Sequence, residues 1–128
     1  MAKATQITVA AQSKPGVLAK VSRALAQAGV NITAICAGES AGRGKIRLLV
    51  SDGARAKAAL AGAKIRCAEE AALLLSLEDR PGALAEVAER LASAKINIKC
   101  AYATAGSGGK AQVVVVVANP DKAERALG

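Results

Sequence analysis

Residues 15–21 read PGVLAKV, and the phrase returns 66 residues later as PGALAEV at residues 81–87. Each copy runs on into an Asn-Ile pair, at residues 31–32 in the first copy and 97–98 in the second. Of the 23 positions from 15 to 37, 11 carry the same residue as the position 66 further on. A period this long that occurs twice indicates two copies of one supersecondary unit.

The duplication predicts two small units in a chain of 128 residues. We place them at residues 1–69 and 70–128, with no linker between them. A unit of about 60 residues buries only about 60% of the surface of its unfolded chain and is marginally stable alone. We therefore expect the two units to share a core or an interface, or to be supported by a second copy of the chain.

The composition is that of a globular protein without a membrane segment. Apolar residues make up 52% of the chain, and no apolar run approaches the roughly 18 residues needed to cross a bilayer. The first residues lack the apolar core of a signal peptide. Three cysteines, Cys36, Cys67 and Cys100, lie far apart, and an odd, scattered set is typical of a reducing compartment. We expect a cytoplasmic protein whose cysteines are small buried hydrophobes.

The net charge of +8 is uneven along the chain. Residues 1–70 hold 11 basic and 4 acidic side chains, a net charge of +7, whereas residues 71–128 hold 7 and 6, a net charge of +1. A basic half attracts anions, which include nucleic acid, anionic metabolites and a partner surface. The alternative is that these charges form only a solvated face.

Hydrophobic periodicity predicts the same order of elements in both copies: strand, helix, strand, strand, helix. In the first copy we expect strands at 6–12, 31–37, 45–51 and 64–68 and helices at 17–28 and 52–61. In the second copy we expect strands at 71–78, 97–103 and 110–118 and helices at 83–94 and 120–127. The glycine-rich segments 38–44 and 105–109 each join two strands, so we interpret them as flexible hairpin loops.

This order is that of the split βαβ, or ferredoxin-like, unit, with both helices on one face of an antiparallel sheet in the strand order 4-1-3-2. The fold class is therefore α+β, with two tandem βαββαβ units, and the second unit lacks its last strand. Its central strands, 71–77 and 113–117, are apolar on both faces, so we expect the face without helices to be buried as well. In the first copy Thr8, Ala10 and Arg47 make that face more polar.

Few residues suit catalysis or metal binding. The chain has no histidine, the commonest acid–base residue and metal ligand. The cysteines lack metal-ligand spacing, and neighbouring carboxylates such as Glu69 and Glu70 point to opposite faces of a strand. We expect no enzyme, no metal and no cofactor. The single aromatic residue, Tyr102, disfavours the mode of RNA-binding domains with this topology, which stack bases on aromatics of the sheet.

The repeated Pro-Gly turn is the best candidate site. Glycine lets the backbone come close to a ligand, and the free N–H groups of a helix start favour an anion such as a carboxylate. We expect Asn31 and Asn97 to lie next to the turn, with backbone carbonyls of the same strand start accepting from an ammonium group. Carboxylate plus ammonium describes a free amino acid. Equally open is the alternative that Pro-Gly only turns the chain and Asn only ends a helix.

Residues 79–84 (DRPGAL) with 96–98 (INI) resemble the motif of the ACT domain, a small regulatory module. Residues 13–18 (SKPGVL) with 29–32 (GVNI) match it less fully, because Ser13 stands where the second copy has Asp79. The resemblance covers nearly the whole chain, which is similar to the small stand-alone tandem ACT proteins. It implies a ferredoxin-like fold, side-by-side pairing of sheets, and amino-acid binding at the interface.

Carried over by position, the resemblance implies ligand-binding residues in both copies: Gly16, Val17, Leu18, Asn31, Ile32, Asp79, Gly82, Ala83, Leu84, Asn97 and Ile98. The leading hypothesis is a non-catalytic regulatory or sensor protein that binds an amino acid and forms a homodimer. One alternative is a protein–protein interaction module that binds no ligand. A less favoured alternative is nucleic-acid binding through the basic first half.

Overall fold

The computed structural model describes residues 2–128, which form six strands and four helices. In chain order these are β1 (Ala2–Gln12), α1 (Val17–Gln27), β2 (Ile32–Ser40), β3 (Arg43–Val50), α2 (Gly53–Gly62), β4 (Ala68–Glu78), α3 (Ala83–Ser93), β5 (Ile98–Ala105), β6 (Lys110–Val117) and α4 (Pro120–Leu127). None of these helices is long and apolar enough to span a membrane, as far as the described residues go.

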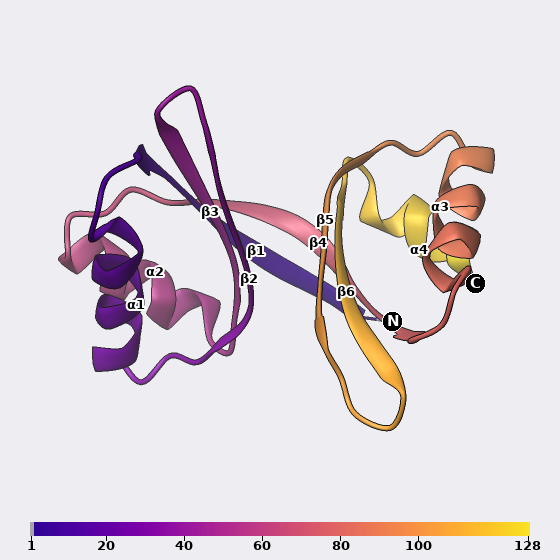
Figure 1. Cartoon of the computed structure of the whole chain (residues 1–128), viewed down its shortest axis with the longest axis horizontal. Helices are drawn as coiled ribbons and strands as arrows, with labels where there is room; N and C mark the ends of the chain where they lie inside the picture. Colours follow the sequence, from indigo (N-terminus) through magenta and orange to yellow (C-terminus); the bar gives the residue numbers. More distant parts are fainter. Residues whose placement is uncertain (1) are drawn as a thin grey trace. The chain divides into compact units, whose positions relative to one another are not determined.

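The chain divides into two compact units. The N-terminal unit comprises residues 5–70, and the C-terminal unit comprises residues 2–4 together with 71–128. In each unit two helices cover one face of an antiparallel sheet, α1 and α2 in the first and α3 and α4 in the second (Figure 1). The predicted α+β class, with two tandem ferredoxin-like units, is confirmed.

Both units have the strand order expected for this topology. In the N-terminal unit the order is β2-β3-β1, and the start of β4 lies beside β1. The Thr8 hydroxyl donates to the Glu70 carboxylate at 3.4 Å across that last pair. In the C-terminal unit the order is β5-β6-β4, and the start of β1 lies beside β4.

The fourth strands are built differently from the prediction. The prediction of a separate strand at 64–68 is wrong, because residues 63–67 form a turn and an irregular segment. Strand β4 then runs unbroken from Ala68 to Glu78. The Ile65 amide donates to the Leu60 carbonyl at 2.8 Å. This bond belongs to the C-terminal end of α2, so the next strand begins only after it. The C-terminal segment does end without a fourth strand, and residues 2–4 of β1 take that place.

The first hairpin is tighter than expected. Instead of a flexible loop over residues 38–44, β2 continues to Ser40 and β3 begins at Arg43. Only Ala41 and Gly42 lie between them, with φ of 52° and 77°. Two consecutive positive φ angles are the signature of a type I′ turn, whose twist matches that of the flanking strands.

Each unit has its own apolar core between sheet and helices. Leu25 of α1, Leu48 of β3 and Leu60 of α2 are fully buried in the N-terminal unit, as are Leu73 and Leu91 in the C-terminal unit.

Strand β6 is buried on both faces. Val113, Val115 and Val117 belong to the helix-side core, and Val114 and Val116, which point the other way, are also buried. In the N-terminal unit Thr8 is buried on the corresponding face, whereas Ala10 is exposed.

The expectation that the cysteines are fully buried is wrong. Cys36, Cys67 and Cys100 are all half-buried. Cys67 packs against the edge of the N-terminal core, in the irregular segment that replaces the expected strand.

Removing residues 2–4 should destabilise the C-terminal unit selectively, because the edge of β4 beside them becomes unpaired. Amide hydrogen exchange should accelerate in β4 and β6 and stay nearly unchanged in β2 and β3. Lys3→Ala is the control, since it keeps the strand backbone and removes only side-chain contacts. Equal acceleration in both units would contradict the assignment of residues 2–4.

The Lys3 ion pair should leave a pH signature. A hydrogen bond from Lys3, then its charge, lowers the pKa of the Asp121 carboxyl below its usual 3.8, and Asp121 in turn raises the pKa of Lys3 above 10.5. The contribution to stability is present between these pH values and is lost as pH falls through the lowered pKa of Asp121. Urea midpoints of the wild type and Asp121→Asn should therefore differ near neutral pH and converge in acid. Because both groups are exposed, the difference should be small and shrink with salt.

Candidate functional site

The two Pro-Gly turns have the same backbone geometry. Gly16, between β1 and α1, has φ 92° and ψ −10°, and Gly82, between β4 and α3, has φ 92° and ψ −16°. These angles lie in the left-handed region, where a side chain is strained and glycine is not. Each turn is tied to the hairpin loop of its unit: the Ser13 amide donates to Gly42 O at 2.9 Å, and the Asp79 amide to Gly109 O at 2.8 Å.

The helices after these turns start without a side-chain cap. Helices α2 and α4 are capped, because Asp52 accepts from the Arg55 amide and Asn119 from the Lys122 amide, both at 3.1 Å. Helices α1 and α3 begin at glycine and have no such hydrogen bond.

The second and third amides of α1 and α3 are therefore open donors, whereas the first amides, of Val17 and Ala83, donate to Lys14 O at 3.5 Å and to Arg80 O at 3.4 Å. The first helical hydrogen bonds run from Lys20 N to Gly16 O at 2.9 Å and from Glu86 N to Gly82 O at 3.0 Å. The amides just before them, at Leu18 and Ala19 in α1, have no helical acceptor. With the positive end of the helix dipole, they form a place that favours an anion.

One carboxylate accompanies each turn, although the two come from different elements. In the C-terminal unit it is Asp79, which is part of the turn itself. In the N-terminal unit Ser13 occupies that position, and its hydroxyl donates to the Glu39 carboxylate of β2 at 2.8 Å. Glu39 has no sequence signal for this role, because only the strand register, with Ser40 and Gln12 both opposite Arg43, brings it to the turn.

A cavity of about 210 Å³ lies between the first turn and the hairpin. Ser13, Val17, Leu18 and Glu39 contribute to its lining, with Ile46 among the apolar residues. We call it the hairpin-side cavity. It combines the uncapped helix start, an apolar wall and a carboxylate.

The structure brings together some of the expected ligand residues. Gly16, Val17 and Leu18 are consecutive at the first turn, and Gly82, Ala83 and Leu84 at the second. Leu18 and Leu84 are large apolar side chains that remain 45% and 54% exposed at the helix starts.

The Asn-Ile pairs lie elsewhere. The expectation that Asn31 sits beside the turn of its own unit is wrong, because Ile32 pairs with Val50 at one end of the sheet and Ser40 with Arg43 at the turn end. The 11-residue helix α1 runs back between them, over about 16 Å. Asn31 instead bonds Ser51 through both its amide and its carbonyl, each at 3.0 Å.

The second copy repeats this separation. Ile98, next to Asn97, pairs with Val117, whereas Lys110 at the other end of β6 pairs with Glu78 beside the turn. Within either unit, the turn residues and the Asn-Ile residues therefore do not form one site.

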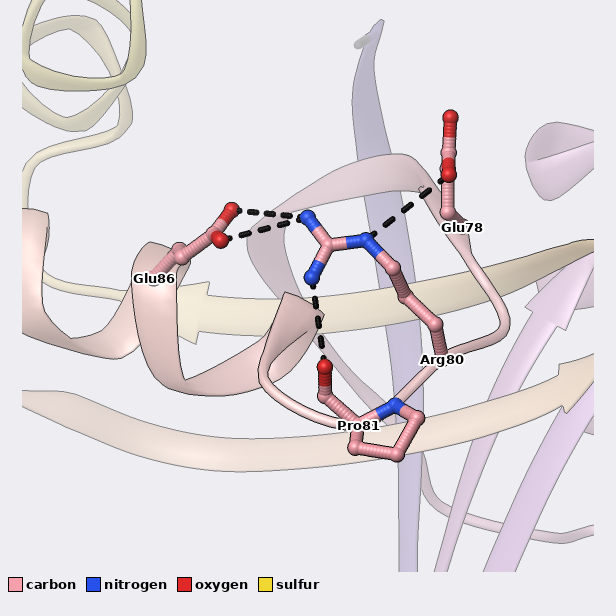
Figure 2. Close-up of polar contacts among 4 residues, drawn as sticks. All are labelled: Glu78, Arg80, Pro81 and Glu86. Carbon is pink, nitrogen blue, oxygen red and sulfur yellow. Dashed lines mark hydrogen bonds and ion pairs between the residues drawn. The ribbon is translucent and has the colours of Figure 1, made fainter.

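An ion-pair cluster surrounds the second turn (Figure 2). The Arg80 guanidinium donates to both carboxylate oxygens of Glu86 at 3.1 and 3.2 Å and lies 3.7 Å from a Glu78 oxygen. It also donates to the Pro81 carbonyl at 3.2 Å, which links the first turn of α3 to the Pro-Gly backbone. Exposed ion pairs contribute little stability, so the main effect of the cluster is local charge neutralisation.

Residues 2–128 contain no group of three or more Cys, Asp or Glu side chains placed to hold a metal ion. The features at the turns are backbone donors, single carboxylates and apolar side chains. They suit reversible binding of a small polar molecule.

A duplicated ferredoxin-like unit with an uncapped Pro-Gly helix start in each copy defines a class of small α+β ligand-binding modules. The chain belongs to the ACT domain family: the model of the ACT domain pair matches residues 2–127.

Solved structures share the fold. Protein BT0572 from Bacteroides thetaiotaomicron is 31% identical, with a TM-score of 0.90 over 98% of this chain and 86% of that one. The regulatory subunit of aspartate kinase from Thermus thermophilus is 24% identical, with a TM-score of 0.71 over 98% and 93%. The same subunit from Thermus flavus is 21% identical, with a TM-score of 0.67 over 98% and 90%. Comparison with curated protein sequences finds no match.

Gly16→Ala should lower the free energy of unfolding by about 1–2 kcal/mol, through the left-handed backbone alone, because no atom lies within 4 Å of the added methyl group. Gly53→Ala is the matched control: it adds the same methyl group in open space without a positive φ. That variant should be neutral or stabilised by up to about 1 kcal/mol. Urea denaturation measures both, and equal effects would contradict the assigned strain.

Proposed function

We propose that this protein is a non-catalytic regulatory or sensor protein that binds a free amino acid at its Pro-Gly turns. The observation that carries the proposal is the contrast among the helix starts: α2 and α4 have side-chain caps, and α1 and α3 do not. An α-carboxylate supplies the acceptor that a cap would otherwise provide.

The remaining groups at each turn suit the rest of an amino acid. The carboxylate of Glu39 in the N-terminal unit, and of Asp79 in the C-terminal unit, would pair with the ammonium group. Leu18 and Leu84, exposed at the helix starts, would cover apolar parts of the ligand.

Asn31, Ile32, Asn97 and Ile98 remain expected ligand residues under one condition. Since each Asn-Ile pair lies at the far end of its sheet from its own turn, it would act on a turn in another copy of the chain. We therefore propose a homodimer in which the start of β2 or β5 of one copy completes a turn of the other. We place this dimer in the cytoplasm, where the thiols of Cys36 and Cys67 stay reduced.

A second candidate is an interaction module without a ligand. Leu18, Ile35 and Leu84 are exposed large apolar side chains, and a protein partner would cover them. This candidate requires a stable protein complex and no response to small molecules.

A thermal-shift screen of the twenty amino acids tests the proposal. At least one should raise the melting temperature at millimolar concentration, because a ligand that binds only the folded state stabilises it. Glu39→Gln and Asp79→Asn should each weaken binding at one turn by about tenfold or more, and the double variant should lose the shift.

Glu89→Gln is the matched control, because it neutralises an exposed carboxylate of α3 away from the turns. A screen without any shift, or a double variant that keeps the full shift, would count against amino-acid binding at these turns.

A further inference from the structure

Each unit has a second cavity at its Pro-Gly turn, and the two cavities are built from equivalent positions. The cavity of the N-terminal unit measures about 560 Å³ and is formed by the end of β1, the turn, the first residues of α1 and the segment 64–66. Its counterpart in the C-terminal unit measures about 330 Å³. Lining positions 12, 14 and 20 of the first recur 66 residues later as positions 78, 80 and 86 of the second.

In the counterpart, the arginine of the turn is paired with carboxylates of the same lining. Arg80 is held by Glu86 on one side and Glu78 on the other (Figure 2). Both oxygens of Glu86 accept from one terminal nitrogen of the guanidinium, and arginine donates to a phosphate or a free carboxylate through the same charge-assisted kind of hydrogen bond.

The N-terminal cavity has the opposite charge pattern. Gln12 stands at the position of Glu78, and Lys20 at the position of Glu86. Lys14, the equivalent of Arg80, therefore has neither of the two carboxylates that pair with Arg80. Lys64 and Arg66 add two further cations from the segment before β4. The lining thus holds four basic side chains and no acidic one, and we call it the basic cavity.

These four cations have no partner in the part of the chain that the structure describes. Within residues 2–128, Lys14, Lys20, Lys64 and Arg66 form no ion pair and no side-chain hydrogen bond. Like charges gathered around one hollow create a positive potential that an anion would relieve. The turn residues Gly16 and Val17, at the uncapped end of α1, lie on the same lining.

We propose that the basic cavity binds the phosphate group of a small phosphorylated molecule. A phosphate carries nearly two negative charges at neutral pH and three acceptor oxygens, which matches several convergent cations better than a single carboxylate does. The bound phosphate would neutralise the cations of the basic cavity, as the Glu86 carboxylate neutralises Arg80 in the C-terminal unit. The site shares Gly16 and Val17 with the proposed amino-acid site but lies on the other side of the turn, since Leu18 and Glu39 are not part of its lining and Lys20, Lys64 and Arg66 are not part of the lining of the hairpin-side cavity.

Isothermal titration of the full chain with inorganic pyrophosphate, at fixed ionic strength, tests this site. We expect saturable binding with one site per chain, because the counterpart lining carries two carboxylates that already pair with Arg80. Lys20→Glu introduces the residue found at the equivalent position of the second repeat. It should weaken binding by at least about tenfold, because it removes one cation and the new carboxylate pairs with the remaining cations of the basic cavity. Lys45→Glu is the matched control: it makes the same charge change on exposed β3, outside the lining.

Three results would overturn the proposal: no binding at millimolar pyrophosphate, equal losses in Lys20→Glu and Lys45→Glu, or tighter binding of single-stranded oligothymidylate with a steep salt dependence. The last would indicate an extended nucleic-acid surface instead. If Lys20→Glu fails to fold, Lys20→Gln makes the same comparison with Lys45→Gln. The amino-acid response of Lys20→Glu should persist, so failure of one site is distinguishable from failure of the other.

Discussion

A glycine held in the left-handed conformation starts α1 and α3, and the arrangement of both units depends on this backbone constraint. With φ of 92° at Gly16 and Gly82, the chain reverses between strand and helix without a capping side chain. The hydrogen bond from each turn to its hairpin loop then fixes the turn against the sheet. The same geometry that packs Leu25 and Leu91 into their cores leaves helix amides open at the surface. The packing of each helix and its open amides therefore come from one local conformation.

Much of the fold was predictable because it depends on periodicity and on a repeated phrase. Helices α1 and α3 lie within two residues of their predicted bounds, since Leu18, Val21 and Leu25 recur at helical spacing and glycine marks each start. The fourth strands were not predictable. Which segment pairs with the edge of β4 depends on a distant partner, residues 2–4, that no local pattern identifies. The placement of Asn31 beside its own turn was wrong, and Glu39 was missed, for the same reason: the separation of Asn31 from Gly16 follows from strand direction, and Glu39 reaches Ser13 only through register.

Duplication has preserved backbone and core more closely than charge. The turns agree within a few degrees of φ and ψ, yet the residue beside each cavity changes from Lys20 to Glu86. Changing a surface charge costs little stability, whereas changing a left-handed glycine costs more, so surface positions diverge first. The result is one unit whose turn arginine, Arg80, is paired with its own carboxylates and another whose turn lysine, Lys14, has no ion-pair partner in the described residues. The net charges of +7 and +1 on the two halves reflect this difference.

Strands β1 and β4 each contribute residues to both compact units, and this has a consequence for biosynthesis. A ribosome releases residues 2–4 first and the strand that they accompany only after residue 70. The N-terminal residues must therefore remain unpaired until most of the chain has emerged, and the last contacts to form are among those of greatest sequence separation. Such contacts slow folding and prolong exposure of strand edges. The C-terminal unit can therefore mature only after residues 71–128 have been translated, although residues 2–4, which belong to it, emerge before the N-terminal unit.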